Sequence, residues 1–137
     1  MQTALTIEVF LSLLLAVALG AVVGIEREKA HRPAGLRTHM LVCLGSCLFT
    51  IVSLGFSAQP AQVAAGVVAG IGFIGAGTIW AEHDKVTGIT TAASLWATAA
   101  IGLTTGLGDY PLAVAVTALV FIILASKYLF QKVGLEQ

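Results

Sequence analysis

The chain is 137 residues long, which is enough for one domain, and 58% of its residues are hydrophobic while only 10% are charged. Ordinary soluble domains are about 45–50% apolar and about 25% charged, so this composition excludes that class and indicates a protein of the lipid bilayer. Seven basic and seven acidic residues give a formal net charge of zero. The overall charge therefore offers no attraction for nucleic acid.

Five apolar stretches follow one another along the chain, and each approaches the roughly 20 residues that a helix needs to cross a hydrocarbon core of about 30 Å. They cover residues 5–25, 39–57, 62–81, 88–107 and 111–130. None shows the strict polar alternation of a membrane barrel strand, and backbone groups in lipid must pair internally, so helices are predicted. The predicted fold is all-α: one polytopic domain over residues 1–137 with about five transmembrane helices.

The first stretch is predicted to be retained as a helix. The N-terminal segment MQTALTIEVF carries Glu8 but no Lys or Arg, whereas a cleavable signal peptide begins with positive charge. With five spans, the connecting segments alternate between two sides, and all seven Lys and Arg residues fall on one of them. The positive-inside rule makes that side cytoplasmic, which places the N-terminus outside and the C-terminus inside.

Charged residues follow the first stretch in GIEREKAHRPAGLRTHM. Lys29 and Arg32 are interpreted as topogenic charges with snorkelling side chains. Glu26, Arg27 and Arg37 border apolar residues on the membrane side, and ionisable groups at that depth pair with one another or mark a functional site. We expect Glu26 or Glu28 to pair with Arg37 across the connection.

The second stretch contains Cys43 and Cys47, which a helix places one turn apart on the same face. No His or third Cys accompanies them, so we interpret them as small packing residues of a membrane helix rather than as ligands of a soft metal.

The third stretch contains AGIGFIGAG, in which Gly70, Gly72 and Gly75 have the GxGxxG spacing of a dinucleotide-binding turn. That motif requires a preceding strand, a following helix and an acidic residue about 20 positions later, and none of these is expected here. Two alternatives remain. The glycines, with Gly77, allow close helix packing, as do the GxxxG pairs Gly66/Gly70 and Gly20/Gly24, or they break the helix and expose carbonyls to a cation.

The next connection, WAEHDKVTG, carries Glu82, His83 and Asp84. Carboxylates of two short loops on one face can converge on a hard divalent cation such as Mg²⁺, so Glu26, Glu82 and Asp84 are candidate ligands. The alternative is that these loop residues are simply solvated.

The fourth stretch carries hydroxyl residues at spacings of four, three, four and seven, which keeps them on one helix stripe. The stripe consists of Thr87, Thr91, Ser94, Thr98 and Thr105. Such hydroxyls form hydrogen bonds to their own backbone or to a neighbouring helix, or they line a hydrated path. No arrangement of His with a Ser or Cys nucleophile is recognisable, so an enzyme is not expected.

Four segments, GIERE, AGLRTHMLVCLG, AGIGFIGAGTI and VTGITTAASLWATAAIGLTTGLG, resemble in order and spacing the membrane domain of the MgtC/SapB family. The resemblance covers residues 20–108, most of the chain. It implies a protein of the bacterial inner membrane that is linked to adaptation to low Mg²⁺ and, in pathogens, to survival inside macrophages. Longer members carry a cytoplasmic C-terminal domain; this sequence reaches Gln137 without one, so regulation through that domain is not expected here.

The resemblance also highlights individual positions of this chain. They are Glu26, Arg27, Gly35, Arg37, Thr38, Gly70, Gly72, Gly75, Gly77, Gly88, Thr90, Thr91 and Trp96.

Our leading hypothesis is a small protein of magnesium homeostasis that regulates other membrane proteins or senses cations. The resemblance names the ATP synthase and cation transporters as candidate partners. The GxxxG faces favour a homo-oligomer, with a dimer as the simplest case. The alternative is a channel or transporter for Mg²⁺ or another cation, with the hydroxyl stripe and the glycine-rich helix as its path.

Overall fold

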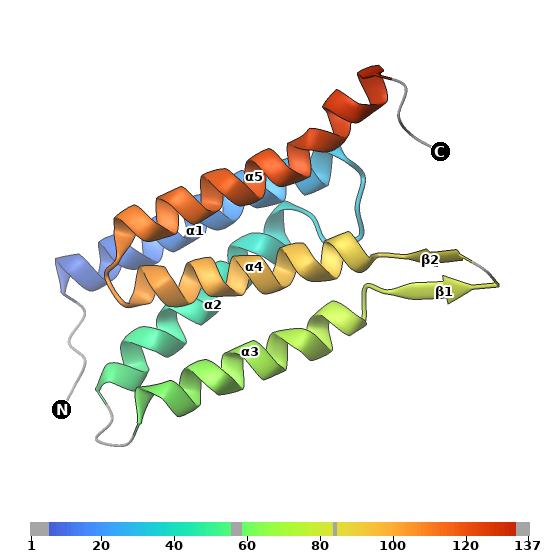
Figure 1. Cartoon of the computed structure of the whole chain (residues 1–137). Helices are drawn as coiled ribbons and strands as arrows, with labels where there is room; N and C mark the ends of the chain where they lie inside the picture. The colour runs from blue at the N-terminus through green and yellow to red at the C-terminus, as the bar shows by residue number, and fades with distance from the viewer. Residues whose placement is uncertain (1–5, 56–58, 84, 134–137) are drawn as a thin grey trace.

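The computed structural model describes residues 6–55, 59–83 and 85–133, with the backbone alone for residues 128–133. Its helices are α1 (Ile7–Lys29), α2 (Leu36–Leu54), α3 (Pro60–Ala76), α4 (Ile89–Gly106) and α5 (Tyr110–Val133). They run alternately up and down as a bundle (Figure 1). The predicted all-α fold with five helices is therefore confirmed.

The helices differ in how well each suits a lipid environment. Within the described part of the chain, three segments are long and apolar enough to cross a membrane: α1, α2 and residues Tyr110–Lys127 of α5. Helix α3 is apolar but has 17 residues, about 25 Å at 1.5 Å per residue. Helix α4 is richer in hydroxyl residues, and its buried side includes Thr91, Ser94, Thr98 and Thr105.

Helix α4 can carry these polar residues because it lies in the middle of the bundle. It packs against α1, α2, α3 and α5, whereas α3 packs only against α4 and α2. The main core cluster joins α1, α2, α4 and α5, and Cys43 and Cys47 are fully buried in it. A second, smaller cluster around Leu95 and Ile71 joins α3 to α4.

Two GxxxG pairs bring the central helices together, and both press against α2. A Cβ at Gly20 would lie 2.7 Å from the carbonyl oxygen of His39, and one at Gly24 would lie 2.7 Å from the Cα of Leu36. Further along α2, Gly102 of α4 meets the carbonyl oxygen of Cys43, and a Cβ at Gly106 would lie 2.6 Å from that of Cys47. Small residues therefore let three backbones approach where lipid supplies no hydrophobic driving force.

The third helix is shorter than the sequence predicts, because it ends at Ala76 rather than near residue 81. The hydroxyl of Thr78 donates to the carbonyl oxygen of Gly75 at 2.8 Å just after this end. The chain then forms an antiparallel hairpin of β1 (Trp80–Glu82) and β2 (Lys85–Thr87), in which Trp80 pairs with Thr87. Aromatic and β-branched residues favour strands, which accounts for a hairpin where the sequence analysis predicted the end of a helix and a loop.

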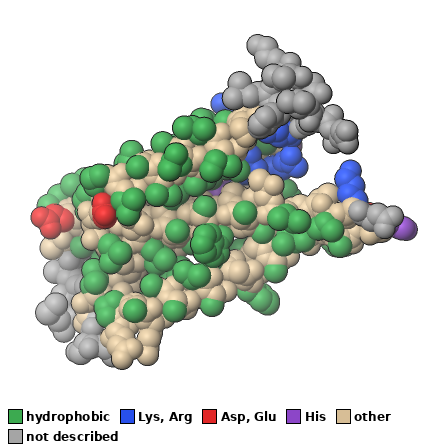
Figure 2. Space-filling model, in the orientation of Figure 1, with side chains coloured by type: hydrophobic (Ala, Val, Ile, Leu, Met, Phe, Trp, Pro, Cys, Tyr) green, Lys and Arg blue, Asp and Glu red, His purple; other side chains and the backbone are tan. Residues whose placement is uncertain are grey.

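The charged residues lie at opposite ends of the bundle. Figure 2 shows the Lys and Arg side chains of the visible face gathered at the hairpin end, with acidic residues at the other end. Glu8 begins α1, and Asp109 precedes α5 at the same end. The one-sided distribution inferred from the sequence is thus reproduced by the described basic residues in three dimensions.

Candidate functional site

A buried ion pair lies near the C-terminal end of α1, at the basic end of the bundle. Glu26 is 4% exposed and Arg27 is 2% exposed. The Nε and Nη2 groups of Arg27 both donate to Oε2 of Glu26. Charges taken out of water are tolerated when they are paired, so the two residues stabilise each other inside the bundle.

The second carboxylate oxygen of Glu26 has no partner among the described residues. Its Oε1 is buried and makes no hydrogen bond. A carboxylate oxygen without a donor is costly in a site of low dielectric constant. This oxygen is the one unsatisfied buried side-chain N or O atom in the described part of the chain.

His39 connects α2 to α4 beside this pair. Its side chain is fully buried, with Nδ1 at 2.9 Å from the carbonyl oxygen of Gly35 and Nε2 at 3.1 Å from the hydroxyl oxygen of Ser94. A carbonyl only accepts, so Nδ1 carries a proton. The sequence analysis did not select His39 as a site residue. The available signal was its position in RTHM, two residues after Arg37; that it lies against Gly24 is known only from the structure.

The hydroxyl of Ser94 has one proton and two candidate acceptors. It lies 2.8 Å from the carbonyl oxygen of Thr91 and 3.1 Å from Nε2 of His39. With Nδ1 carrying the proton of a neutral imidazole, Nε2 is an acceptor, and the hydroxyl of Ser94 donates either to it or to the carbonyl oxygen of Thr91. The orientation of this one hydroxyl therefore decides whether Ser94 donates across to α2.

The remaining hydroxyls of the stripe bind their own helix. Thr98 donates to the carbonyl oxygen of Ser94 and Thr105 to that of Ile101, both at 2.8 Å, and both side chains are fully buried. The members of the stripe on α4 face the inside of the bundle. Thr87 is outside it, because it belongs to β2 and donates to the carbonyl oxygen of Trp80 at 3.4 Å.

The expected ion pair with Arg37 is not formed. Glu26 pairs with its neighbour Arg27, and Glu28 instead accepts a hydrogen bond from the backbone N–H of Leu36 at 2.9 Å. The first N–H groups of a helix lack partners within it, so Glu28 caps the start of α2. Arg37 is exposed, and Thr38 is half-buried.

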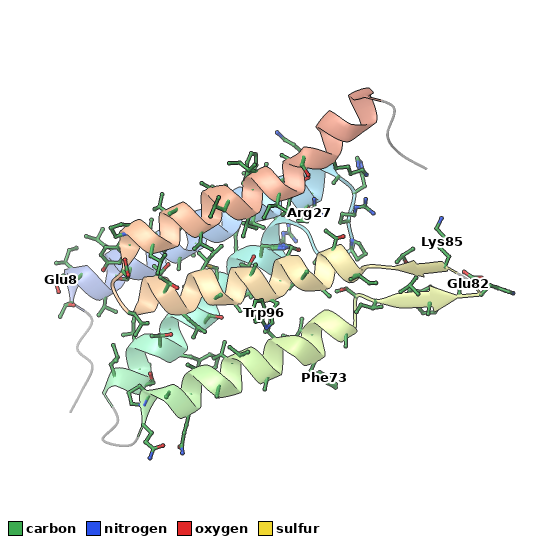
Figure 3. All side chains as sticks on the ribbon, in the orientation of Figure 1. Glu8, Arg27, Phe73, Glu82, Lys85 and Trp96 are labelled. Atoms are coloured by element: carbon green, nitrogen blue, oxygen red, sulfur yellow. The ribbon has the colours of Figure 1, made fainter. Side chains whose placement is uncertain are left out.

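The three candidate Mg²⁺ ligands are not brought together. Glu26 is buried against Arg27, whereas Glu82 lies on the hairpin beyond the bundle, and Figure 3 shows this separation from Arg27 to Glu82. Asp84 lies outside the described residues. Among the residues that are described, no group of three or more His, Cys, Asp and Glu side chains is arranged to hold a metal ion.

The glycines of the third helix lie in a continuous helix that reaches Ala76, and Gly77 follows as its C-terminal cap. A Cβ at Gly66, Gly70 or Gly72 would meet nothing within 4 Å. Gly75 differs, because a Cβ there would lie 3.4 Å from that of Ala92 on α4. The broken helix that we considered is absent, and most of these glycines lie on an open face rather than in a contact within the chain.

A comparison with known protein families shows which family the chain belongs to. The model of the MgtC family matches residues 13–133. The chain belongs to the MgtC family. It is a multi-pass bacterial membrane protein, and the resemblance that its four motifs suggested is confirmed.

Several curated relatives show the extent of the similarity. The chain is 41% identical to YhiD of Escherichia coli (strain K12) over 130 residues, which are 88% of this chain and 60% of YhiD. It is 46% identical to Protein MgtC of Salmonella typhimurium (strain LT2) over 111 residues, 80% of this chain and 48% of that protein. It is 36% identical to Protein SapB of Bacillus subtilis (strain 168) over 133 residues, 89% of this chain and 56% of that protein. The chain thus spans about half of the length of these relatives.

No solved structure matches the chain.

The geometry of the bundle gives physical reasons for several MgtC motif positions. A Cβ at Gly35 would collide with the carboxylate of Glu28, so the capping contact requires glycine there. Gly88 has φ +90° and would bring a Cβ onto the carbonyl oxygen of Thr78, so both its conformation and its surroundings require glycine.

The aromatic motif position lies on the outside of the bundle. Trp96 is 54% exposed on α4, and Phe73 of α3 is 86% exposed and points away from the bundle in Figure 3. Thr91 is buried at the start of α4, while Thr90 beside it is exposed. The MgtC motifs therefore contribute both to the buried polar site and to surfaces that face lipid or another protein.

Proposed function

We propose that this chain is a membrane protein of magnesium homeostasis that acts on other membrane proteins or responds to cations, and does not conduct ions through its own bundle. The name of the relative YhiD proposes magnesium transport for that protein. The single observation that carries our proposal is the closed polar interior. The hydroxyls of the α4 stripe are buried and bind the helix's own carbonyl oxygens.

Hydroxyls engaged in this way are poor ligands for a passing ion. A hydrated path needs oxygen atoms that can replace the water around a cation. Two glycines of α4 pack directly onto α2 beside these hydroxyls. Gly102 meets the carbonyl oxygen of Cys43, and Gly106 meets that of Cys47. This contact leaves no room for water between the two helices at that level.

The charge at the basic end also opposes a cation path through the single chain. Arg27, Arg32 and Lys127 line the cavity between the ends of α1 and α5 and the start of α4. Glu26 neutralises Arg27, but Arg32 and Lys127 still repel a divalent cation, and the repulsion is strong where water is partly excluded. The polar site around Glu26 and His39 suits a regulatory role better than conduction.

The proposal assigns no catalytic activity to the chain. In the described structure, both nitrogens of His39 take part in hydrogen bonds: Nδ1 with Gly35 at the start of α2, and Nε2 with Ser94 of α4. The partners that we propose are other membrane proteins, with the ATP synthase and cation transporters as candidates from the family resemblance, and a second copy of the chain.

The open glycine face of α3 is the surface that we assign to the second copy. Gly20 and Gly24, the other pair expected to mediate association, are occupied by α2 within the chain. Gly66 and Gly70 are free of such contacts and line an apolar groove of about 590 Å³ between α2 and α3. Replacing Gly70 by Leu should lower the yield of cross-linked dimer in membranes; an unchanged yield would count against this face.

A flux assay tests the central proposal against the rival. Purified chain in sealed proteoliposomes should admit Mg²⁺, Na⁺ and K⁺ no faster than protein-free vesicles do, while the same chain supports growth at low Mg²⁺ in cells that lack their own family member. A channel predicts instead a selective flux that Arg37→Ala or Gly75→Leu reduces. Such a flux, from protein with intact helical content, would refute the proposal.

A further inference from the structure

A basic cavity lies beside the ion pair at the hairpin end of the bundle. It has a volume of about 520 Å³ and is bounded by the end of α1, the α1–α2 connection, the start of α4 and the end of α5. We call it the basic basin. Its charged lining residues are Arg27, Arg32 and Lys127, and none of the acidic side chains that the structure describes lines it.

The three cations come from three different parts of the chain. Arg27 lies in the last turn of α1 and is buried, Arg32 belongs to the connection that follows and is exposed, and Lys127 lies on α5. Glu26 neutralises the formal charge of Arg27, whereas Arg32 and Lys127 pair with no acidic side chain among the described residues. Side chains so far apart in sequence meet here only because α1, α4 and α5 pack together.

Backbone donors add to these cations. The residues Gly88, Ile89, Thr90 and Thr91 line the basin and form the start of α4. No side chain caps this helix, and its first intrahelical bond runs from the N–H of Ala92 to the carbonyl oxygen of Gly88. The N–H groups of the three residues before Ala92 therefore precede the helical ladder, and such groups together with the helix dipole favour an anion.

The opposite wall of the basin is apolar. Ile123 and Leu124 of α5, with Val86 and Ile89 beside the hairpin, complete the lining. Ile123 is 68% exposed and Ile89 is 59% exposed, so this wall opens to the surroundings of the bundle. A site with cations and amides on one side and an open apolar wall on the other fits a charged group carried on an apolar chain.

We propose that the basic basin binds a phosphate group, carried either by an anionic phospholipid at the membrane surface or by a small soluble phosphate ester. Arginine and lysine donate to phosphate oxygens with charge assistance, and helix N-termini bind the same group. Basic pockets between membrane helices on the cytoplasmic side are suited to phospholipid headgroups. The site goes beyond the proposed function and does not depend on it.

The test uses the full chain purified in detergent and native mass spectrometry. It is titrated separately with phosphatidylglycerol, phosphatidylcholine and glycerol 3-phosphate. The variant Arg32→Gln/Lys127→Gln removes two charges from the basin, and Lys29→Gln/Lys85→Gln removes two charges from the same end outside it. The basin variant should bind phosphatidylglycerol about tenfold more weakly than the unmodified chain, since each basic residue near anionic lipid adds measurably to affinity.

The matched variant should retain affinity within about twofold, because general attraction between exposed charges is largely screened by salt. Tight binding of phosphatidylglycerol alone assigns the site to lipid, and binding of glycerol 3-phosphate that the basin variant loses assigns it to a soluble ester. Circular dichroism confirms that both variants remain folded. Equal losses in the two variants, or no preference of the unmodified chain for either phosphate over phosphatidylcholine, would overturn the proposal.

Discussion

Glu26 and Arg27 are adjacent in sequence, and both are buried with their charged groups in contact. Their pairing removes the need for Arg37, which remains exposed at the start of α2. Arg27 also lines the basic basin. The hydrogen bond between His39 and Ser94 lies at the same end of the bundle. At the scale of single residues, a short stretch at the end of α1 thus connects three features of the site.

The Arg27→Gln variant tests whether the pair stabilises the bundle. Removing the guanidinium leaves the carboxylate of Glu26 buried without a counter-charge, and breaking a buried pair in this way costs about 3–5 kcal/mol. The double variant Glu26→Gln/Arg27→Gln should recover a large part of that loss, because two neutral amides need no counter-charge. Unfolding in mixed detergent, followed by circular dichroism, measures both changes; a double variant as unstable as Arg27→Gln would show that the charge itself is not the cause.

At the scale of elements, the glycines differ in whether they lie against the backbone of another helix. The pair Gly20 and Gly24 on α1 and the pair Gly102 and Gly106 on α4 contact successive parts of α2, and Gly20 and Gly102 both lie against Cys43. The sequence analysis identified the first pair and overlooked the second, although GLTTG has the same spacing. The pair Gly66/Gly70 on α3 has that spacing too, yet it makes no such contact within the chain.

Matched alanine substitutions distinguish the two kinds of glycine. Gly20→Ala places a Cβ 2.7 Å from the carbonyl oxygen of His39, and overpacking of this kind costs about 1–3 kcal/mol. Gly66→Ala meets nothing within 4 Å, and alanine favours a helix over glycine by about 1 kcal/mol.

The Gly20→Ala variant should therefore unfold at lower detergent stress than the unmodified chain, and Gly66→Ala at equal or higher stress. The same unfolding titration measures both variants. If both substitutions destabilise the chain equally, the contact of α1 with α2 is not as close as the structure places it.

At the scale of the whole molecule, charge divides the bundle into two unlike ends. The described basic residues lie at the end of α1, in the connection to the start of α2, on the hairpin and towards the end of α5, whereas Glu8 and Asp109 lie at the opposite end. The basic end also contains the buried ion pair and the basic basin. If this end faces the cytoplasm, both features are exposed to cytoplasmic ions and to the lipids of the inner leaflet.

Cysteine labelling tests that orientation. In spheroplasts, a membrane-impermeant maleimide should label Asp109→Cys, which is exposed at the opposite end, and should label Lys85→Cys only after the membrane is opened. The native Cys43 and Cys47 are fully buried and provide a low background. The positive-inside rule is the physical basis; labelling of Lys85→Cys alone in closed spheroplasts would mean the inverted orientation.

The sequence alone determined the number and order of the helices, the separation of charge between the ends and the family. These properties follow from the local run of apolar residues and from motifs that can be recognised one at a time. The hydroxyl stripe was also predictable, because helical spacing by itself places Thr91, Ser94 and Thr98 on one face. The hairpin was missed, since Ile79 and Trp80 are apolar enough to extend a predicted membrane helix.

Only the tertiary structure decided which helices meet and which groups pair. All apolar helix faces are equivalent in lipid, so the spacing of Gly66 and Gly70 could not show that they lie open while Gly102 and Gly106 pack against α2. His39 reaches Ser94 across 55 positions of the chain, and the charges of the basic basin come from three segments. Such contacts depend on the rotation and neighbours of whole helices, which no local pattern of residues specifies.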